Sequence, residues 1–596
     1  MNRPLNHGSE TRKTGAIDGV KLAILNNRWE AVARKMANTL LRTGRSGVLA
    51  TARDFSCCIV TADNRLLATA ESIPIHVLVG PDMMARSMCE LHPGLKPGDA
   101  FLHNSPYHGC SHAADLSILV PVFDDDGRHR YTAIVKAHQA DIGNSIPTTY
   151  FGHAKDVYNE GALIFPAVQV QRDYKDIEDI IRMCRMRIRV PDQWWGDYLG
   201  MIGAGRIAER EIRAVGAEFG WDELAELGEQ WFSYSADRMK AAIAKLPAKT
   251  ATSSSTHDPL PGTPAEGVRI NATVSVDPDE GFIDIDLTDN IDALDLGINV
   301  SEACTRTAAL IGVFNSIDHT VPRNAGSFGR VRLKLREGAV VGVPKHPTSC
   351  SVATTNVADR ISNAVQTAIA AMDSRFGQAE TGALSPATMA VISGKDPRKG
   401  KPFVNQIFLG ATAGAGTPTE DSWITIAHAG NAGMLYIDSI EILEMAYPIR
   451  CYQRRLVTDT EGAGEFTGAP SLMGEYGPDG CEMVVNAVSD GTLNAAKGAA
   501  GGASAGGARQ YRKRADGSLE ELPVVVSVTV APDERILSYS CGGGGFGDPR
   551  QRQPERVLHD LREGLVTRER AQEVYGVSVT ETLEIDREAT ARLRAK

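Results

Sequence analysis

Residues 102–141 read LHNSPYHGCSHAADLSILVPVFDDDGRHRYTAIVKAHQAD. Within this stretch, the apolar runs at 118–123 and 131–138 flank the sequence Asp-Asp-Asp-Gly at 124–127. Asp and Gly favour tight turns, because the Asp side chain binds nearby backbone groups and Gly adopts a positive φ without strain. The pattern predicts two β-strands joined by a turn, with a polar loop before the first strand and a histidine closing the second.

The chain upstream of this stretch predicts two helices and a β-hairpin. Residues 17–44 carry apolar side chains at helical spacing, as one face of an amphipathic helix requires. Residues 55–61 and 65–69 are strand-like and flank the turn sequence Ala-Asp-Asn at 62–64, which indicates a hairpin. A second helix is predicted at 81–91.

The chain downstream changes character twice. Residues 177–189 and 199–219 have helical patterns, whereas 249–267 is rich in Thr, Ser and Pro and lacks periodicity. Such composition is typical of a linker or a long loop. Apolar and polar residues then alternate at 268–276 and 281–287, which predicts strands.

We therefore predict a mixed α/β, multidomain chain. Its 596 residues are 42% hydrophobic, which is more than one core needs. The predicted parts are an N-terminal α/β region at 17–248, a linker or long loop at 249–267, a strand-rich α/β region at 268–549 and a helical C-terminal tail at 550–596.

Composition excludes several classes of protein. The net charge is −11, and without a basic stripe we expect no nucleic-acid partner. No run of about 18 apolar residues predicts a membrane span, and residues 1–15 lack the apolar run of a signal peptide. The ten cysteines form no C-x-x-C pair, so neither a zinc ribbon nor a redox motif is predicted. We expect a cytoplasmic protein with reduced thiols.

Histidines are concentrated in the polar loop and at the end of the second strand. Five of the chain's 14 histidines fall within residues 102–141, and four of them, His103, His108, His112 and His138, belong to the polar loop or close the second strand. Imidazole and carboxylate ligands suit Zn, Mn or Fe. Spacing alone does not select the ligands, because Cys110 and His112 compete with His103 and His108. The alternative is a set of hydrogen-bonded loop histidines without a metal.

Several motifs in one order resemble the hydantoinase B/5-oxoprolinase family, which includes the alpha-type subunits of acetone carboxylase and a component of caprolactamase. Together the motifs extend from about residue 17 to about residue 577, nearly the whole chain. They are RDFS at 53–56, ESIPIH at 71–76, NSPYHGCSHAAD at 104–115, AHQADIG at 137–143, YNEG at 158–161, and GGFGDP at 544–549 followed by PERV at 554–557.

The resemblance implies a hydantoinase B-like fold with a metal-bearing N-terminal region. It places the metal ligands on Asp54, His112 and His138, with Zn expected and Mn or Fe as alternatives. One Asp and two His leave room for water or substrate, which is the pattern of a catalytic site. The chain departs from the family's motifs at four positions, which are Ser105, Cys110, Ser111 and Ala137.

Four further residues are candidate catalytic groups. His76 is either a catalytic histidine or a hydrogen-bonded core group. Asp115 and Asp141 each follow a proposed ligand by three residues and either orient an imidazole or cap a loop. Glu160 is either a general base or a surface carboxylate.

The resemblance also implies a function. The chain is expected to be the B-type subunit of an ATP-dependent hydrolase of cyclic amides or imides. An actin-like, kinase-type A subunit would use the ATP and phosphorylate the substrate, and the two chains would form a hetero-oligomer. Consistent with this division, the chain has no G-x-x-x-x-G-K-[ST] sequence, and the G-x-G-x-x-A sequence at 203–208 follows no predicted strand. The alternatives are a subunit of an ATP-dependent ketone carboxylase and a non-catalytic scaffold subunit.

Overall fold

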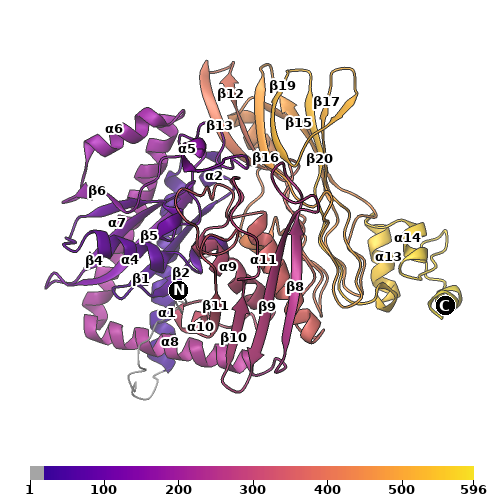
Figure 1. The fold of residues 1–596 in the computed structure, drawn as a ribbon, viewed down its shortest axis with the longest axis horizontal. Coiled ribbons are helices and arrows are strands. Elements are labelled where there is room, and N and C mark those ends of the chain that lie inside the picture. Colours follow the sequence, from indigo (N-terminus) through magenta and orange to yellow (C-terminus); the bar gives the residue numbers. More distant parts are fainter. Residues whose placement is uncertain (1–18, 71, 596) are drawn as a thin grey trace. The chain divides into compact units, whose positions relative to one another are not determined.

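The computed structural model describes residues 19–70 and 72–595, which fold as two compact units (Figure 1). Unit 1 consists of the chain up to Lys249 together with Ser275–Leu310 and Asp318–Thr354. Unit 2 consists of Thr250–Val274, Ile311–Ile317 and the chain from Thr355. The predictions made for residues 1–15, and the start of the helix predicted at 17–44, lie outside the described residues.

Unit 1 is built on a seven-stranded antiparallel sheet with the strand order β2-β1-β5-β4-β3-β6-β7. Both predicted strand pairs are part of it, as β1–β2 and β4–β5. The strands are β1 Phe55–Thr61, β2 Leu66–Thr69, β3 Ala100–His103, β4 Asp115–Phe123, β5 His129–His138, β6 Val168–Arg172 and β7 Lys175–Asp176.

One face of this sheet is apolar and packs on helices. Side chains alternate between faces along a strand, so Phe55, Leu116 and Ala137 point to one side and join a core with residues of α1 and α7. Asp54, Asp115 and His138 belong to the opposite set of positions. The alternation thus gives the central strands one face for packing and one for polar side chains.

The helices of unit 1 agree with most of the sequence predictions. α7 begins at Pro191, a residue suited to the first turn of a helix, and so contains the G-x-G-x-x-A sequence within a continuous helix. The helices are α1 Gly19–Thr43, α2 Gly47–Ala50, α3 Pro74–Val77, α4 Pro81–Leu91, α5 Val157–Glu160, α6 Glu178–Arg187, α7 Pro191–Phe219, α8 Trp221–Ile243 and α10 Ala325–Phe328. The parallel strands β10 Phe282–Asp286 and β11 Val331–Lys334 complete the unit. Helix α9 Glu302–Phe314 and strand β9 Val268–Asp277 contribute residues to both units.

Unit 2 contains two antiparallel sheets that share an apolar core. The first has the order β13-β12-β16-β19 and the second the order β14-β15-β20-β17-β18. Their strands are β12 Met389–Asp396, β13 Lys401–Phe408, β14 Ile449–Leu456, β15 Leu472–Pro478, β16 Met483–Val488, β17 Arg509–Lys513, β18 Leu519–Glu521, β19 Val525–Val530 and β20 Arg535–Tyr539. The helices are α11 Val357–Met372, α12 Ile440–Ala446, α13 Pro554–Arg562, α14 Arg568–Glu573 and α15 Arg587–Arg594.

The four glycines at 542–545 are required by the close approach of neighbouring backbone segments. A Cβ on Gly543 would lie 1.9 Å from the carbonyl oxygen of Gly414, and a Cβ on Gly468 would lie 1.9 Å from that of Gly543. These segments therefore pass backbone against backbone, where no other residue fits.

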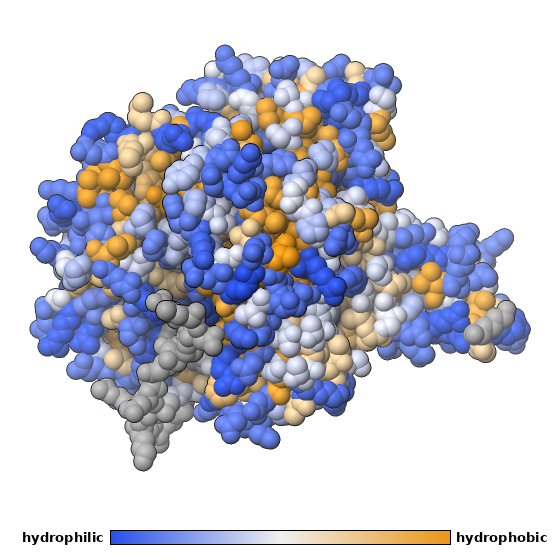
Figure 2. All heavy atoms as spheres, viewed as in Figure 1, coloured by the Kyte–Doolittle hydropathy of each residue, from blue (hydrophilic) through white to orange (hydrophobic). Residues whose placement is uncertain are grey.

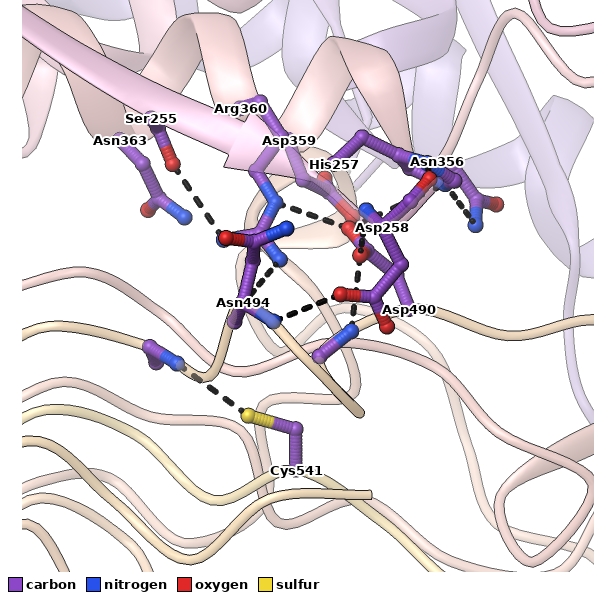
Figure 3. A network of polar contacts seen from close by, with 12 residues as sticks. Ser255, His257, Asp258, Asn356, Asp359, Arg360, Asn363, Asp490, Asn494 and Cys541 are labelled. Atoms are coloured by element: carbon purple, nitrogen blue, oxygen red, sulfur yellow. Dashed lines mark hydrogen bonds and ion pairs between the residues drawn. The ribbon is translucent and has the colours of Figure 1, made fainter. Parts of the chain in front are cut away.

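The prediction of a linker or long loop at 249–267 is wrong for the first half of that segment, because Thr250–His257 forms strand β8. Its Thr and Ser residues do not alternate with apolar residues, so the pattern that predicts a strand is missing here. A buried polar network secures the end of this strand within unit 2 (Figure 3). Asp258 accepts hydrogen bonds from the backbone N–H groups of Leu493 and Asn494, at 3.0 and 2.7 Å.

Arg360 is the centre of the same network. Its guanidinium is 2% exposed and lies 2.8 Å from Asp490 and 3.4 Å from Glu380, both of which are buried. Asp490 in turn accepts a hydrogen bond from the backbone N–H of Asp258 at 2.9 Å. Burying charged groups is costly unless ion pairs and hydrogen bonds of this kind offset the loss of water, and these contacts join α11, β8 and the loop after β16.

Hydrophilic residues dominate the face shown in Figure 2, with hydrophobic residues scattered among them. Among the described residues, no helix is both long and apolar enough to cross a bilayer. All ten cysteines are free thiols.

Candidate active site

Three neighbouring strands bring polar side chains into one row. His138 ends β5 and pairs with Asp115 at the start of β4. On the other side, the backbone N–H of His138 donates to the carbonyl of Asp54, just before β1, at 3.0 Å. Directly opposed residues of antiparallel strands have Cβ atoms about 4.5–5.5 Å apart on one face. The sheet register therefore gathers two carboxylates around His138.

His112 reaches this row from the loop before β4. Its Nε2 lies 3.0 Å from Asp115 Oδ1 and 3.2 Å from His138 Nδ1, and His138 Nδ1 lies 3.0 Å from the same Asp115 oxygen. All three side chains are at most 1% exposed. Among the described residues, His112, Asp115 and His138 form the one group of His, Cys, Asp and Glu side chains whose donor atoms are close enough to hold a metal ion.

The hydrogen bonds behind the two imidazoles fit a cation between them. His112 Nδ1 lies 2.7 Å from the carbonyl oxygen of Ser351, which only accepts, so Nδ1 carries the hydrogen and a neutral ring has its lone pair on Nε2. His138 Nε2 lies 3.1 Å from Thr149 Oγ1, which can accept in the same way. Such outer hydrogen bonds are the usual support of metal-bound histidines.

The spacing of the donor atoms also fits a metal. Ligand atoms about 2.1 Å from one ion, at tetrahedral or octahedral angles, lie about 3.0–3.4 Å apart. The measured separations of 3.0, 3.0 and 3.2 Å fall in this range. Two nitrogens and one carboxylate oxygen are a donor set suited to Zn, Mn or Fe.

The charges of the site are coupled through Asp115. Burial alone would raise the pKa of Asp115, but the charge of His112 and the hydrogen bonds from both imidazoles hold this pKa well below the usual range. Burial alone would lower the pKa of His112, but the carboxylate of Asp115 raises it. Without a metal, a proton on His112 can therefore occupy the space between the two groups.

Asp54 and His76 lie beside the three converging groups. His76 Nε2 is 3.6 Å from Asp54 Oδ1 and 3.3 Å from Asp115 Oδ2, and its Nδ1 is 3.3 Å from Ser56 Oγ. Burial lowers the pKa of His76 to about 3. The structure thus places His76 beside both carboxylates, and Asp115 contacts both imidazoles.

The other ligand candidates lie apart from this cluster. His103 Nδ1 accepts from the backbone N–H of Ser105 at 3.2 Å, and His108 Nδ1 lies 2.8 Å from the Ser105 hydroxyl. The Cys110 sulfur lies 3.2 Å from the backbone carbonyl of Asp115. Burial raises the pKa of Cys110, which favours the thiol over the thiolate that metals bind.

The remaining catalytic candidates have different surroundings. Asp141 accepts from the backbone N–H groups of Arg189 and Gly143, at 2.6 and 3.1 Å, and pairs with the Arg189 guanidinium at 2.9 Å. These are the contacts of a loop cap. Glu160 is 3% exposed and accepts from Ser349 Oγ at 2.7 Å, so the surface alternative for Glu160 is wrong. Burial raises its pKa.

Sequence reasoning missed the groups that support the two imidazoles. Ser351 is 239 residues from His112, and no local pattern connects them. Tyr150 stacks on the His138 ring with centroids 5.2 Å apart. Lys136 did carry a signal, because a charged residue interrupts the apolar strand that ends at His138.

Known proteins with similar sequences match most of the length of the chain. The family described as Hydantoinase B/oxoprolinase matches residues 18–549. Caprolactamase subunit beta of Pseudomonas jessenii is 26% identical over 585 residues, which are 97% of this chain and 99% of that protein. 5-oxoprolinase 1 of Arabidopsis thaliana is 23% identical over 553 residues, and this chain spans only 42% of its length.

Two solved structures share the fold. The crystal structure of the ATP-dependent caprolactamase from Pseudomonas jessenii superposes with a TM-score of 0.86 at 23% identity, covering 98% of this chain and 100% of that one. A nucleotide-free acetone carboxylase structure gives a TM-score of 0.84 at 17% identity, covering 97% and 82%. With the family match extending over most of its length, this mixed α/β, multidomain chain belongs to the Hydantoinase B/oxoprolinase family.

Proposed function

We propose that this chain is the B-type component of an ATP-dependent hydrolase of cyclic amides and that it acts with a kinase-type A subunit. The observation that carries the proposal is the convergence of His112, Asp115 and His138 within 3.2 Å, with the outer nitrogen of each imidazole facing a protein oxygen. The ATP-dependent caprolactamase among the related proteins supports the choice of a cyclic amide.

The lengths of the related proteins support a partner chain. This chain spans 99% of a protein named as a subunit and 42% of a single-chain 5-oxoprolinase. The remaining part of the longer chain is the expected counterpart of the A subunit. Because this chain has no G-x-x-x-x-G-K-[ST] sequence, we assign ATP use to the A subunit.

The chemistry divides between the two components. The A subunit would transfer a phosphoryl group from ATP to the amide oxygen, which makes the carbon electrophilic. Addition of one water to that carbon, and departure of the nitrogen as an amine, opens the ring and leaves an acyl phosphate. A second water releases phosphate and the carboxylate, so each turnover consumes one ATP and two waters.

The residues of this chain would hold a divalent metal, with Zn expected and Mn or Fe as alternatives. His112, His138 and a carboxylate from Asp115 or Asp54 are its proposed ligands. When bound, such a metal supplies a Lewis acid that lowers the pKa of water and polarises an oxygen. The Ser351 carbonyl accepts from His112 Nδ1 and so fixes the tautomer that this requires, and the Thr149 hydroxyl can accept from His138 Nε2 in the same way.

Two further side chains would move protons. Burial raises the pKa of Glu160 above its ordinary value, which brings it closer to the range in which a carboxyl group can both accept and return a proton, and we propose it as a general acid or base. His76 lies within 3.6 Å of both Asp54 and Asp115, and we propose that it shares a proton with them.

The test is reconstitution of the chain with an A subunit. Cyclic amides and imides would be supplied with ATP, and ring opening and ADP would be measured for the wild type and for His112→Ala. We expect about one ADP per ring opened, metal near one equivalent in the wild type, and loss of both metal and ring opening in the variant. Ring opening without ATP, or by His112→Ala at the wild-type rate, would contradict the proposal.

A ketone carboxylase subunit is the second candidate. The shared fold with acetone carboxylase over 97% of this chain favours it. In the same reconstituted system, ATP-dependent incorporation of labelled bicarbonate into a ketone would select this function, whereas ring opening without bicarbonate selects the hydrolase.

A further inference from the structure

A second polar row lies on the same face of the sheet as the candidate site. Lys136 on β5 pairs with Ser56 on β1 and with Ser117 on β4. Because side chains repeat on one face every second residue, Lys136 shares the face of His138. It is 1% exposed. One row further along the same face, Ile134 pairs with Leu119, and both are buried, so Lys136 lies where the polar residues of this face give way to apolar ones.

The surroundings of Lys136 are unusual for a buried ammonium group. Its Nζ lies 3.2 Å from Ser111 Oγ, and within the described parts of the chain no carboxylate lies within ion-pair distance of it. Burial of a charged group is costly unless hydrogen bonds or opposite charges offset the loss of water. An apolar side chain would fill this position at lower cost, so the lysine indicates a requirement beyond packing.

The hydrogen bonds from Lys136 form a chain with one direction. An ammonium group only donates, so the Ser111 hydroxyl accepts from Lys136. Ser111 Oγ then donates its own hydrogen to Asp115 Oδ2, because an ionised carboxylate only accepts. The other oxygen, Asp115 Oδ1, is the one that lies 3.0 Å from both His112 Nε2 and His138 Nδ1.

We propose that Lys136 and Ser111 are positioning residues that fix the carboxylate of Asp115, so that Oδ1 faces the space between the two imidazoles. The inference rests on the proposed function insofar as that space holds a divalent metal. It adds the side chains that set the orientation of one ligand, at a position where the family's motif has Thr in place of Ser111 and so keeps the hydroxyl.

Measurement of the metal affinity distinguishes a positioning role of Lys136 from an effect of its positive charge alone. A positive charge near the site repels a second cation. If Lys136 acted through its charge alone, Lys136→Met would bind a divalent ion more tightly. If Lys136 orients Asp115 through Ser111, the same variant binds more weakly, because the carboxylate loses its fixed geometry. The two roles of Lys136 therefore predict changes of metal affinity in opposite directions.

The experiment measures Zn affinity of the purified full chain by competition with a chromophoric chelator. The absorption spectrum of the Co-substituted protein reports the geometry of the ligands. We expect Ser111→Ala and Lys136→Met each to weaken Zn binding about 10- to 100-fold, the range seen when support for a metal ligand is removed. The Co spectrum should change in both variants.

Three further variants sharpen the test. Ser111→Thr keeps the hydroxyl and should remain within about 3-fold of the wild type. The double variant should be no weaker than the weaker single variant, because both changes break one chain of interactions. Thr132→Val removes a buried hydroxyl from the same strand, one that lies 3.0 Å from the His129 ring, and should leave the affinity unchanged.

Three outcomes would overturn the inference that Lys136 and Ser111 position Asp115. Tighter binding by Lys136→Met, additive effects in the double variant, or a Ser111→Ala affinity equal to the wild type would each do so while leaving the proposed function intact. A wild-type chain that binds no divalent ion would remove both this inference and the metal of the proposed function. If Lys136→Met does not fold, Ser111→Ala compared with Ser111→Thr still decides the matter.

Discussion

His138 Nδ1 lies 3.0 Å from Asp115 Oδ1, and the two residues are paired across the β4–β5 ladder. The candidate site is therefore a product of strand register. A shift of one residue would turn either side chain to the opposite face. Both strands also carry the apolar face that packs on the helices, so the same pairing forms the core and the site.

Paired carboxamide variants identify the carboxylate that holds the metal. Asp115→Asn should lower bound metal to below about a tenth of an equivalent, because Asp115 is the carboxylate that contacts both imidazoles. Asp54→Asn should retain more metal, because the donor atoms close enough to hold one ion are those of His112, Asp115 and His138. Elemental analysis of both proteins measures this. Metal lost from Asp54→Asn and kept in Asp115→Asn would instead select the ligand set implied by the family resemblance.

Removal of the buried guanidinium should destabilise unit 2. Arg360→Met leaves Asp490 and Glu380 buried without their partner, and breaking a buried pair in this way costs about 3–5 kcal/mol. Urea unfolding measures the change. Arg332→Met is the control, because its pair with Asp284 is about half exposed on both sides and should contribute at most about 1 kcal/mol. Equal effects of the two substitutions would contradict the assignment.

The ion pair between Arg360 and Asp490 predicts that the stability of the protein falls at acidic pH. Burial would raise the pKa of Asp490, but Arg360 and the hydrogen bonds lower it. A lowered carboxyl pKa contributes stability that is complete above the unfolded value of about 3.9 and is lost as pH falls through the folded value. Below about pH 4, the wild type should therefore lose stability more steeply than Asp490→Asn. Parallel curves for the two proteins would show that Asp490 is not the group responsible.

The buried carboxyl group of Glu160 predicts the opposite dependence of stability on pH. Its raised pKa gives stability that is complete below the unfolded value of about 4.3 and is lost as pH rises through the folded value. Glu160→Gln removes this loss, so at pH 7 the variant should melt at the same temperature as the wild type or higher. If Glu160 moves a proton in the reaction, the variant should nevertheless lose activity about 100-fold or more. A variant equally destabilised at pH 4 and pH 7 would rule out the burial effect.

The glycine run should not tolerate a methyl group. Gly543→Ala would place its Cβ 1.9 Å from a backbone carbonyl, and the chain should be recovered mainly as unfolded or insoluble protein. Gly228→Ala is the matched control, because nothing lies within 4 Å of its Cβ in helix α8. The control should gain up to about 1 kcal/mol, since Ala is the better helix former. Normal yield and stability of Gly543→Ala would contradict the close packing.

The sequence by itself located some of the strands and helices of the structure. Alternation and turn residues are local signals, and they located β1, β2, β5, β9 and β10 to within a few residues. They failed at β8, whose Thr and Ser residues give no apolar alternation. The histidines of the site were also visible, because His112 and His138 belong to motifs whose order is specific to the family.

Only the tertiary structure decided how these groups meet. Pairing of β4 with β5 places Asp115 against His138, and Ser351 approaches His112 from 239 residues away. The family resemblance assigned the carboxylate ligand to Asp54, and nothing in the sequence showed that Asp115 contacts both imidazoles or separated Glu160 from a surface carboxylate. Distances between side chains depend on strand register, which the apolar pattern and the turn set together, and on long-range packing, which the spacing of residues along the chain does not show.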